Sequence, residues 1–122
     1  MNSSKDFKDL IVWQKSMELV AEVYRLVKKL PKEELYALSD QIRRSAISIP
    51  SNIAEGQGRN SMKEFNQFLA ISKGSKAELE TQLLLCVQIN YLDKSEIETA
   101  INLIQEIGKM INALQKSLTT NY

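Results

Sequence analysis

The sequence predicts an all-α protein, namely an antiparallel up-down-up-down four-helix bundle formed by a single domain that spans residues 1–122. The first observation is that the chain holds only four glycines and two prolines, so long segments lack helix breakers. The second is that apolar residues recur at intervals of three and four, the spacing of one helix face. Four such segments, joined by short connections, pack most simply as an up-down-up-down bundle.

The first helix is predicted at about residues 10–29, where apolar side chains form two stripes instead of one. One stripe contains Trp13, Met17, Val20, Tyr24 and Val27, and the other contains Val12, Leu19, Val23, Leu26 and Leu30. Two stripes require two partners, which leaves two interpretations: a generous core, or a core together with a subunit interface. Because large apolar surfaces left in water usually mark contact sites, we favour the interface. We assign it to Val12, Leu19, Val23 and Leu26 and expect a homo-oligomer.

The second helix is predicted at about residues 39–56, with Ser39 as its N-cap. Its apolar stripe consists of Ile42, Ala46, Ile49 and Ile53, and it passes straight through Pro50. We therefore predict one kinked helix, in which Ser48 and Ser51 bond the backbone that proline loosens. The alternative is a true break with Ser48 as a fresh N-cap. Gly56 and Gly58 are expected to end the helix in the left-handed conformation.

The third helix, at about residues 61–89, opens with a capping box in which Ser61 caps the helix and Glu64 reaches back. Its small residues Ser72, Gly74 and Ser75 would let another helix approach closely, and Asn90 is expected to end it in the left-handed conformation. The fourth helix, at about residues 94–118, is expected to be capped by Asp93 and carries a heptad seam. The seam consists of Ile97, Ala100, Ile104, Ile107, Ile111, Leu114 and Leu118.

The residue types that most catalytic chemistry needs are scarce. The chain contains no histidine, which removes the commonest general base and metal ligand. Its single cysteine, Cys86, can form neither an intramolecular disulfide nor a structural zinc site, and its place on an apolar helix face favours a buried side chain. We therefore predict a protein that is not an enzyme and that has no metal, no cofactor and no small-molecule substrate.

Overall charge and hydropathy restrict the function further. Sixteen basic and fifteen acidic residues give a net charge of +1, which argues against a protein built mainly to neutralise phosphate. The N-terminal stretch MNSSKDFKDL lacks the apolar run of a signal peptide, and no stretch approaches the ~20 apolar residues of a membrane span. A lone thiol suits a reducing compartment. We therefore expect a cytoplasmic protein without a membrane partner.

A local basic set lies near the predicted helix ends and consists of Lys28, Lys29, Lys32, Arg43, Arg44, Arg59 and Lys63. One interpretation is a solvated surface with ion pairs to Glu33, Glu34 and Asp40. The other is a rim that contacts phosphates, in which case repetition around an oligomer would strengthen a modest field. The candidate nucleic-acid-binding residues are Lys28, Lys29, Arg43, Arg44, Arg59 and Lys63.

Three segments also carry a resemblance to a known family: DLIVWQKSMELVAEVYRL (9–26), DQIRRSAISIPSNIAEGQGR (40–59) and GSKAELETQLLL (74–85). Over residues 6–117 the chain closely resembles the four-helix-bundle proteins named for the intervening sequences of bacterial 23S ribosomal RNA genes. The middle segment is the most specific, because it combines an arginine pair with Ile-Pro-Ser-Asn-Ile-Ala-Glu-Gly.

The resemblance implies an antiparallel four-helix bundle that assembles into closed rings, typically homopentamers, and that has no established enzymatic activity. The family is also similar to the accessory protein of diversity-generating retroelements, a basic pentamer that contacts nucleic acid and a reverse transcriptase. The nearly neutral charge of this chain departs from that protein. The resulting hypothesis is a non-catalytic adaptor whose partner is RNA or a nucleoprotein. The alternative is a protein–protein scaffold with no nucleic-acid binding.

Overall fold

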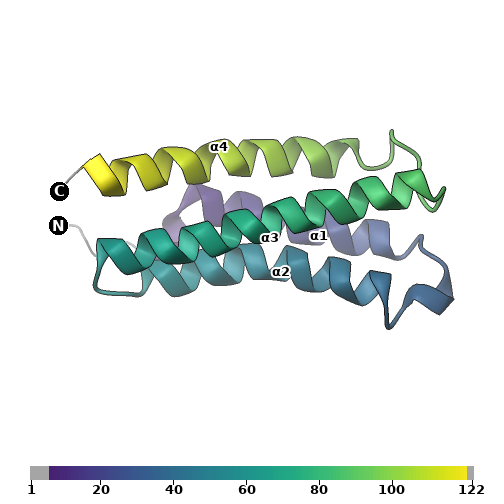
Figure 1. The fold of residues 1–122 in the computed structure, drawn as a ribbon, viewed down its shortest axis with the longest axis horizontal. Coiled ribbons are helices and arrows are strands. Elements are labelled where there is room, and N and C mark those ends of the chain that lie inside the picture. Colours follow the sequence, from purple (N-terminus) through teal and green to yellow (C-terminus); the bar gives the residue numbers. More distant parts are fainter. Residues whose placement is uncertain (1–5, 121–122) are drawn as a thin grey trace.

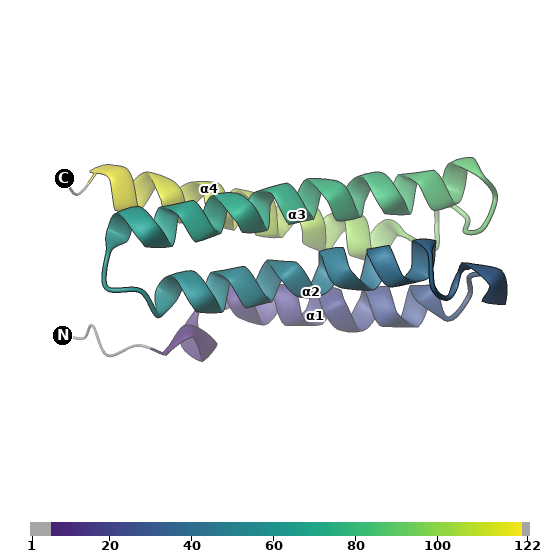
Figure 2. The same cartoon turned by 60° about the horizontal axis from the view of Figure 1, so that its bottom comes forward.

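The computed structural model describes residues 6–120, which form four long helices and no strands. The helices are α1 (Ile11–Val27), α2 (Leu38–Gln57), α3 (Met62–Gln88) and α4 (Glu98–Thr120), and two short 3-10 helices are η2 (Phe7–Asp9) and η3 (Lys32–Glu34). Consecutive long helices are joined at alternate ends of an elongated rod (Figures 1 and 2). Over these residues each long helix packs against two others, with no contact between α1 and α3 or between α2 and α4. The bundle is therefore square in section.

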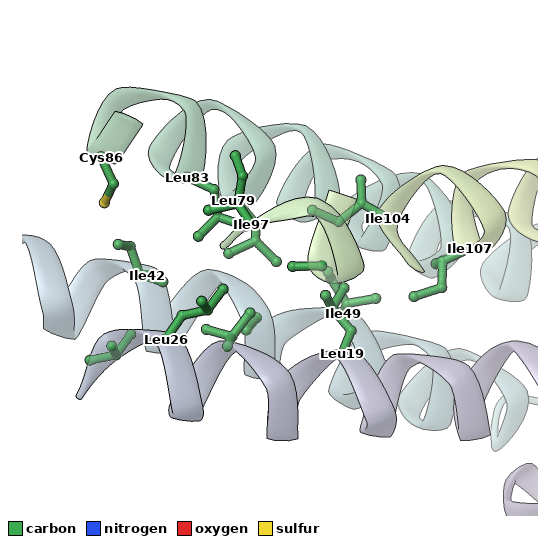
Figure 3. Packing of buried hydrophobic residues seen from close by; sticks show 14 of the residues in the cluster. Leu19, Leu26, Ile42, Ile49, Leu79, Leu83, Cys86, Ile97, Ile104 and Ile107 are labelled. Carbon is green, nitrogen blue, oxygen red and sulfur yellow. The ribbon is translucent and has the colours of Figure 1, made fainter. Parts of the chain in front are cut away.

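The apolar stripes predicted for the second and fourth helices form most of the core. Ile42, Ala46, Ile49 and Ile53 of α2 are fully buried, and so is the α4 seam between Ala100 and Ile111. Figure 3 shows Ile42 and Ile49 pointing into the same space as Leu19 and Leu26 of α1. These predictions of buried positions are confirmed.

The assignment of the subunit interface on the first helix was wrong. Val12, Leu19, Val23 and Leu26 are buried inside the bundle itself, so none of these side chains lies on a surface that a second copy could cover. The other stripe is more exposed, at 46% for Met17 and 41% for Tyr24, although Trp13 and Val20 are half-buried and Val27 is buried. The cause is that α2 and α4 pack against α1 on the side of Leu19 and Leu26. Helical periodicity shows that α1 has two apolar stripes, but it does not determine which of them faces the neighbouring helices.

Helix α2 is continuous through Pro50, which excludes a break with Ser48 as a fresh N-cap. The serines nevertheless act differently from the prediction. The Ser48 hydroxyl lies 2.7 Å from the Ser75 hydroxyl of α3, and Asn52 Nδ2 donates to both the carbonyl and the hydroxyl of Ser48. The Ser72 hydroxyl of α3 donates to the Ile49 carbonyl at 2.9 Å. Hydroxyls therefore join α2 to α3 beside the proline.

The predicted left-handed glycines at the end of α2 were also wrong, because neither has a positive φ. Gly56 serves close packing: a Cβ added there would lie 2.6 Å from Phe68 Cβ of α3. By contrast, the prediction for Asn90 is confirmed, since its φ is 66°. The Tyr91 amide then donates to the Cys86 carbonyl at 2.8 Å, which closes the C-terminus of α3.

The helix starts differ from expectation in three places. Helix α2 begins one residue before Ser39, which therefore lies in the first turn and does not cap it. Ser61 caps α3 by accepting from the Glu64 amide, but the Glu64 carboxylate turns toward Arg59 at 3.8 Å. Helix α4 begins only at Glu98, after a turn in which the Glu96 carboxylate accepts from the Asp93 amide at 2.8 Å.

Candidate functional site

Two grooves compete as the candidate site, and their linings differ in charge. The larger, of about 560 Å³, lies between α3 and the start of α4. Its lining combines three apolar side chains with four polar ones, among which Lys94 and Glu98 balance each other in charge. A smaller groove of about 290 Å³ lies where α1 ends and α2 begins. We call it the basic groove; its lining is Tyr24, Val27, Lys28, Leu30, Pro31, Lys32, Leu35, Ser39 and Arg43. The basic groove is the better candidate because its charges are uncompensated.

Three cations line the basic groove and no acidic residue does. Within residues 6–119, Lys28, Lys32 and Arg43 form no ion pair with a carboxylate. Two acidic residues nearby in sequence, Glu34 and Asp40, have partners other than these three cations. Glu34 accepts from the Tyr91 hydroxyl at 2.7 Å and from the Leu38 amide at 3.4 Å, while Asp40 pairs with Arg44 at 3.1 Å. The groove is therefore an electropositive pocket at one end of a nearly neutral protein.

The local sequence explains why these cations converge. Helix α1 ends at Val27, and Pro31 then turns the chain through η3, which brings Lys28 and Lys32 to the same side of the connection. Arg43 lies in the second turn of α2, which returns beside α1 (Figure 2). Its Nη2 donates to the Leu35 carbonyl at 3.2 Å. That bond fixes the guanidinium at the groove and leaves most of its five N–H donors for a ligand.

Two other candidate residues at this end of the bundle are engaged in ion pairs. Lys29 donates to Glu96 at 2.8 Å and thereby ties the end of α1 to the turn before α4. Arg44 pairs with Asp40 and lies on the other side of α2, against a polar groove of about 160 Å³ that also contains Ser48, Ser75 and Glu78. The adjacent arginines therefore face different grooves.

The remaining two candidates lie at the opposite end of the rod. Arg59 follows α2 and Lys63 lies in the first turn of α3, about 25 Å from Arg43 at 1.5 Å per helical residue. Arg59 pairs with Glu55 at 2.9 Å and lies over the Phe68 ring, 5.0 Å from its centroid. These contacts hold the α2–α3 connection together. The six predicted residues thus form two separate groups, of which only Lys28 and Arg43 share the basic groove.

Sequence reasoning missed three residues of this site. Lys32 belonged to the basic set but was not chosen as a contact, Ser39 was assigned to a helix cap, and Tyr24 was assigned to an apolar stripe. Lys32 directly follows Pro31, and a lysine placed just after a forced turn is a signal that could have found it. Tyr24 and Ser39 reach the groove only through the packing of α1 against α2.

An apolar groove of about 310 Å³ adjoins α1 and α2 farther along the bundle. Its lining is Trp13, Met17, Val20, Ile47, Pro50, Ser51 and Ala54. The exposed stripe of α1 thus lies together with Ile47 of α2, which is 41% exposed. This surface, which we call the apolar groove, replaces the erroneous assignment as the candidate contact surface.

Other chemistry has little support in the described part of the chain. Residues 6–119 contain no group of three or more histidine, cysteine, aspartate or glutamate side chains placed to hold a metal ion. Burial raises the pKa of the Cys86 thiol, which keeps it protonated and unreactive. Over the same residues, no helix has the length and apolar character needed to cross a bilayer.

The fold places this chain in the class of small all-α four-helix bundles. Within that class the chain belongs to the family of 23S rRNA-intervening sequence proteins, whose family model matches residues 8–113. A solved structure of a protein of unknown function from the S23 ribosomal protein family of Bacteroides thetaiotaomicron is similar, with 30% identity and a TM-score of 0.80. The match covers 87% of this chain and 99% of that one. No curated protein is a significant match.

Proposed function

We propose that this protein is a non-catalytic, homo-oligomeric adaptor that binds nucleic acid or a nucleoprotein through its basic groove. The observation that carries the proposal is the convergence of Lys28, Lys32 and Arg43 on one groove without a carboxylate partner. Lysine and arginine side chains supply the main affinity for phosphate backbones. The name of the family and the ribosomal family of its structural relative favour ribosomal RNA as the class of partner.

Oligomerisation is part of the proposal because one groove is a small site. A single chain has a net charge of +1 and about three groove cations, which corresponds to weak binding at physiological salt. Copies that dock through the apolar groove would repeat the basic groove around one assembly and multiply its field. A closed homopentameric ring is the assembly that the resemblance implies, and the proposal keeps the bend that the sequence predicts at Pro50.

The test measures binding of a structured ribosomal RNA fragment as a function of salt. The test variant combines Lys28→Ala, Lys32→Ala and Arg43→Ala, and the control combines Lys73→Ala, Lys109→Ala and Lys116→Ala, which removes the same charge from exposed positions of α3 and α4. Wild type should lose affinity as salt rises, and the test variant should reduce the slope of log affinity against log salt by about 2 to 3. Absence of binding at low salt, or equal loss in both variants, would refute the proposal.

A protein–protein scaffold is the second candidate, and the apolar groove favours it. Met17 and Ile47 leave a continuous apolar surface that a partner could cover without any phosphate contact. This function predicts that partners captured from cell extract survive nuclease treatment and that the groove-cation variant captures them equally well. Loss of all partners on nuclease treatment would exclude it.

A further inference from the structure

The basic groove combines its cations with an apolar wall, which is more than a phosphate contact needs. Tyr24 is 41% exposed and lines the groove together with Val27, Leu30, Pro31 and Leu35. Its volume of about 290 Å³ is at the lower limit of sites that enclose a small organic molecule. A duplex surface cannot enter a space of this size, whereas one nucleotide turned out of its helix can.

A second feature of the groove is a hydroxyl near the start of α2. The Ser39 residue is only 2% exposed and lines the groove, and within residues 6–119 its hydroxyl forms no hydrogen bond with the protein. This hydroxyl is therefore free to donate to an anion that enters the groove. The helix start itself is already engaged, because the Leu38 amide donates to the Glu34 carboxylate at 3.4 Å, so the anion would depend on the side chains that line the groove.

The three cations line this same groove. Arg43 is held by the Leu35 carbonyl, which belongs to the apolar wall, so its guanidinium lies where the wall meets the charged side of the groove. Lys28 and Lys32 approach from the end of α1 and from η3. An anionic group in the groove would lie among three cations and a hydroxyl, and an attached flat ring would have the Tyr24 ring in the same lining.

We propose that the basic groove accepts one unpaired nucleotide of RNA, with its phosphate on Lys28, Lys32, Arg43 and the Ser39 hydroxyl and its base against the Tyr24 ring. This inference rests on the proposed function and adds that the protein distinguishes unpaired from paired RNA. The recognition is physical: an extruded base has a free π-face, which aromatic side chains stack on irrespective of sequence.

The experiment compares a 12-nucleotide single-stranded RNA with a fully paired duplex of equal length, using fluorescence anisotropy on the full chain. The test variant is Tyr24→Ala. The matched control is Tyr36→Ala, which removes a tyrosine that is 90% exposed and does not line the groove. Light scattering establishes that both variants keep the assembly state of the wild type.

We expect wild type to bind the single strand more tightly than the duplex. Tyr24→Ala should weaken single-strand binding about 5- to 150-fold, the range for one stacked base, and leave duplex binding unchanged. Tyr36→Ala should leave both unchanged, and Lys28→Ala should weaken both. If both RNAs bind equally and Tyr24→Ala has no effect while Lys28→Ala weakens binding, the nucleotide site is refuted and the proposed function stands. If neither RNA binds at low salt, the proposed function itself fails.

Discussion

Replacing Gly56 with alanine tests the packing of α2 against α3 most sharply. The new Cβ would lie 2.6 Å from Phe68 Cβ and 3.0 Å from Phe65 Cδ1, whereas carbon atoms pack favourably at about 3.5–4.0 Å. Phe68 Cβ is attached directly to the α3 backbone, so relief requires α3 to move by about 1 Å. Overpacking of this kind costs about 1–3 kcal/mol, and the higher helix propensity of alanine returns at most about 1 kcal/mol.

Gly56→Ala should therefore destabilise the protein by about 1–2 kcal/mol, which lowers Tm by roughly 3–10 °C in a domain of this size. The matched control is Gly74→Ala in α3, because a Cβ at Gly74 meets nothing within 4 Å. Removing an exposed glycine from a helix interior should instead raise the unfolding free energy by up to about 1 kcal/mol. Thermal unfolding followed by circular dichroism measures both. An unchanged or higher Tm for Gly56→Ala would refute the close approach of α3.

Three further predictions concern the ends and faces of the bundle. Tyr91→Phe removes the hydroxyl that donates to the Glu34 carboxylate, so the midpoint of urea unfolding should fall; an unchanged midpoint would contradict this. The Asp93 amide and then Lys29 lower the pKa of the Glu96 carboxyl, so Glu96 stabilises the fold above its ordinary pKa and this contribution is lost as pH falls through the lowered value. Below about pH 4.3, Tm should therefore fall less steeply with decreasing pH in Glu96→Gln than in the wild type. An equally steep fall in both proteins would show that Glu96 does not contribute to this pH dependence. If the proposed oligomer forms through the apolar groove, Met17→Asp should split it and leave a helical monomer, whereas Leu19→Asp should unfold the chain; light scattering and circular dichroism distinguish the two results. A folded Leu19→Asp monomer would argue that Leu19 lies outside the core.

The sequence predicts the core well where one stripe stands out. The Ile42–Ile53 stripe and the α4 seam each hold more apolar residues than the other faces of their helices, so periodicity identifies the buried side directly. Helix α1 has two apolar stripes, and both have helical spacing, so periodicity does not show which one is buried. Composition distinguishes them: the buried stripe is aliphatic, while the exposed one contains tryptophan, methionine and tyrosine, residue types that are enriched at interfaces.

The candidate site was harder to predict because it depends on which helices become neighbours. Arg43 and Arg44 are adjacent in sequence, yet successive residues project about 100° apart on a helix, so they reach different grooves. Arg59 and Lys63 were grouped with them by charge alone, although the length of α2 separates the two groups. Conversely, Asn90 was predicted correctly because a helix ending needs only local backbone chemistry.

The hydroxyl contacts between α2 and α3 bear on the order in which the chain folds. These two helices are consecutive, share the most extensive packing in the bundle, and are joined by a short connection, so bringing them together loses little chain entropy. We expect this hairpin to form first, with kinetic φ-values higher for Ser72→Ala than for Leu26→Ala; the reverse order would exclude it. The basic groove is lined by residues of both α1 and α2, so it forms only when α1 packs against α2. If that packing is the last step of folding, a chain in which only α2 and α3 have paired would lack the proposed phosphate site.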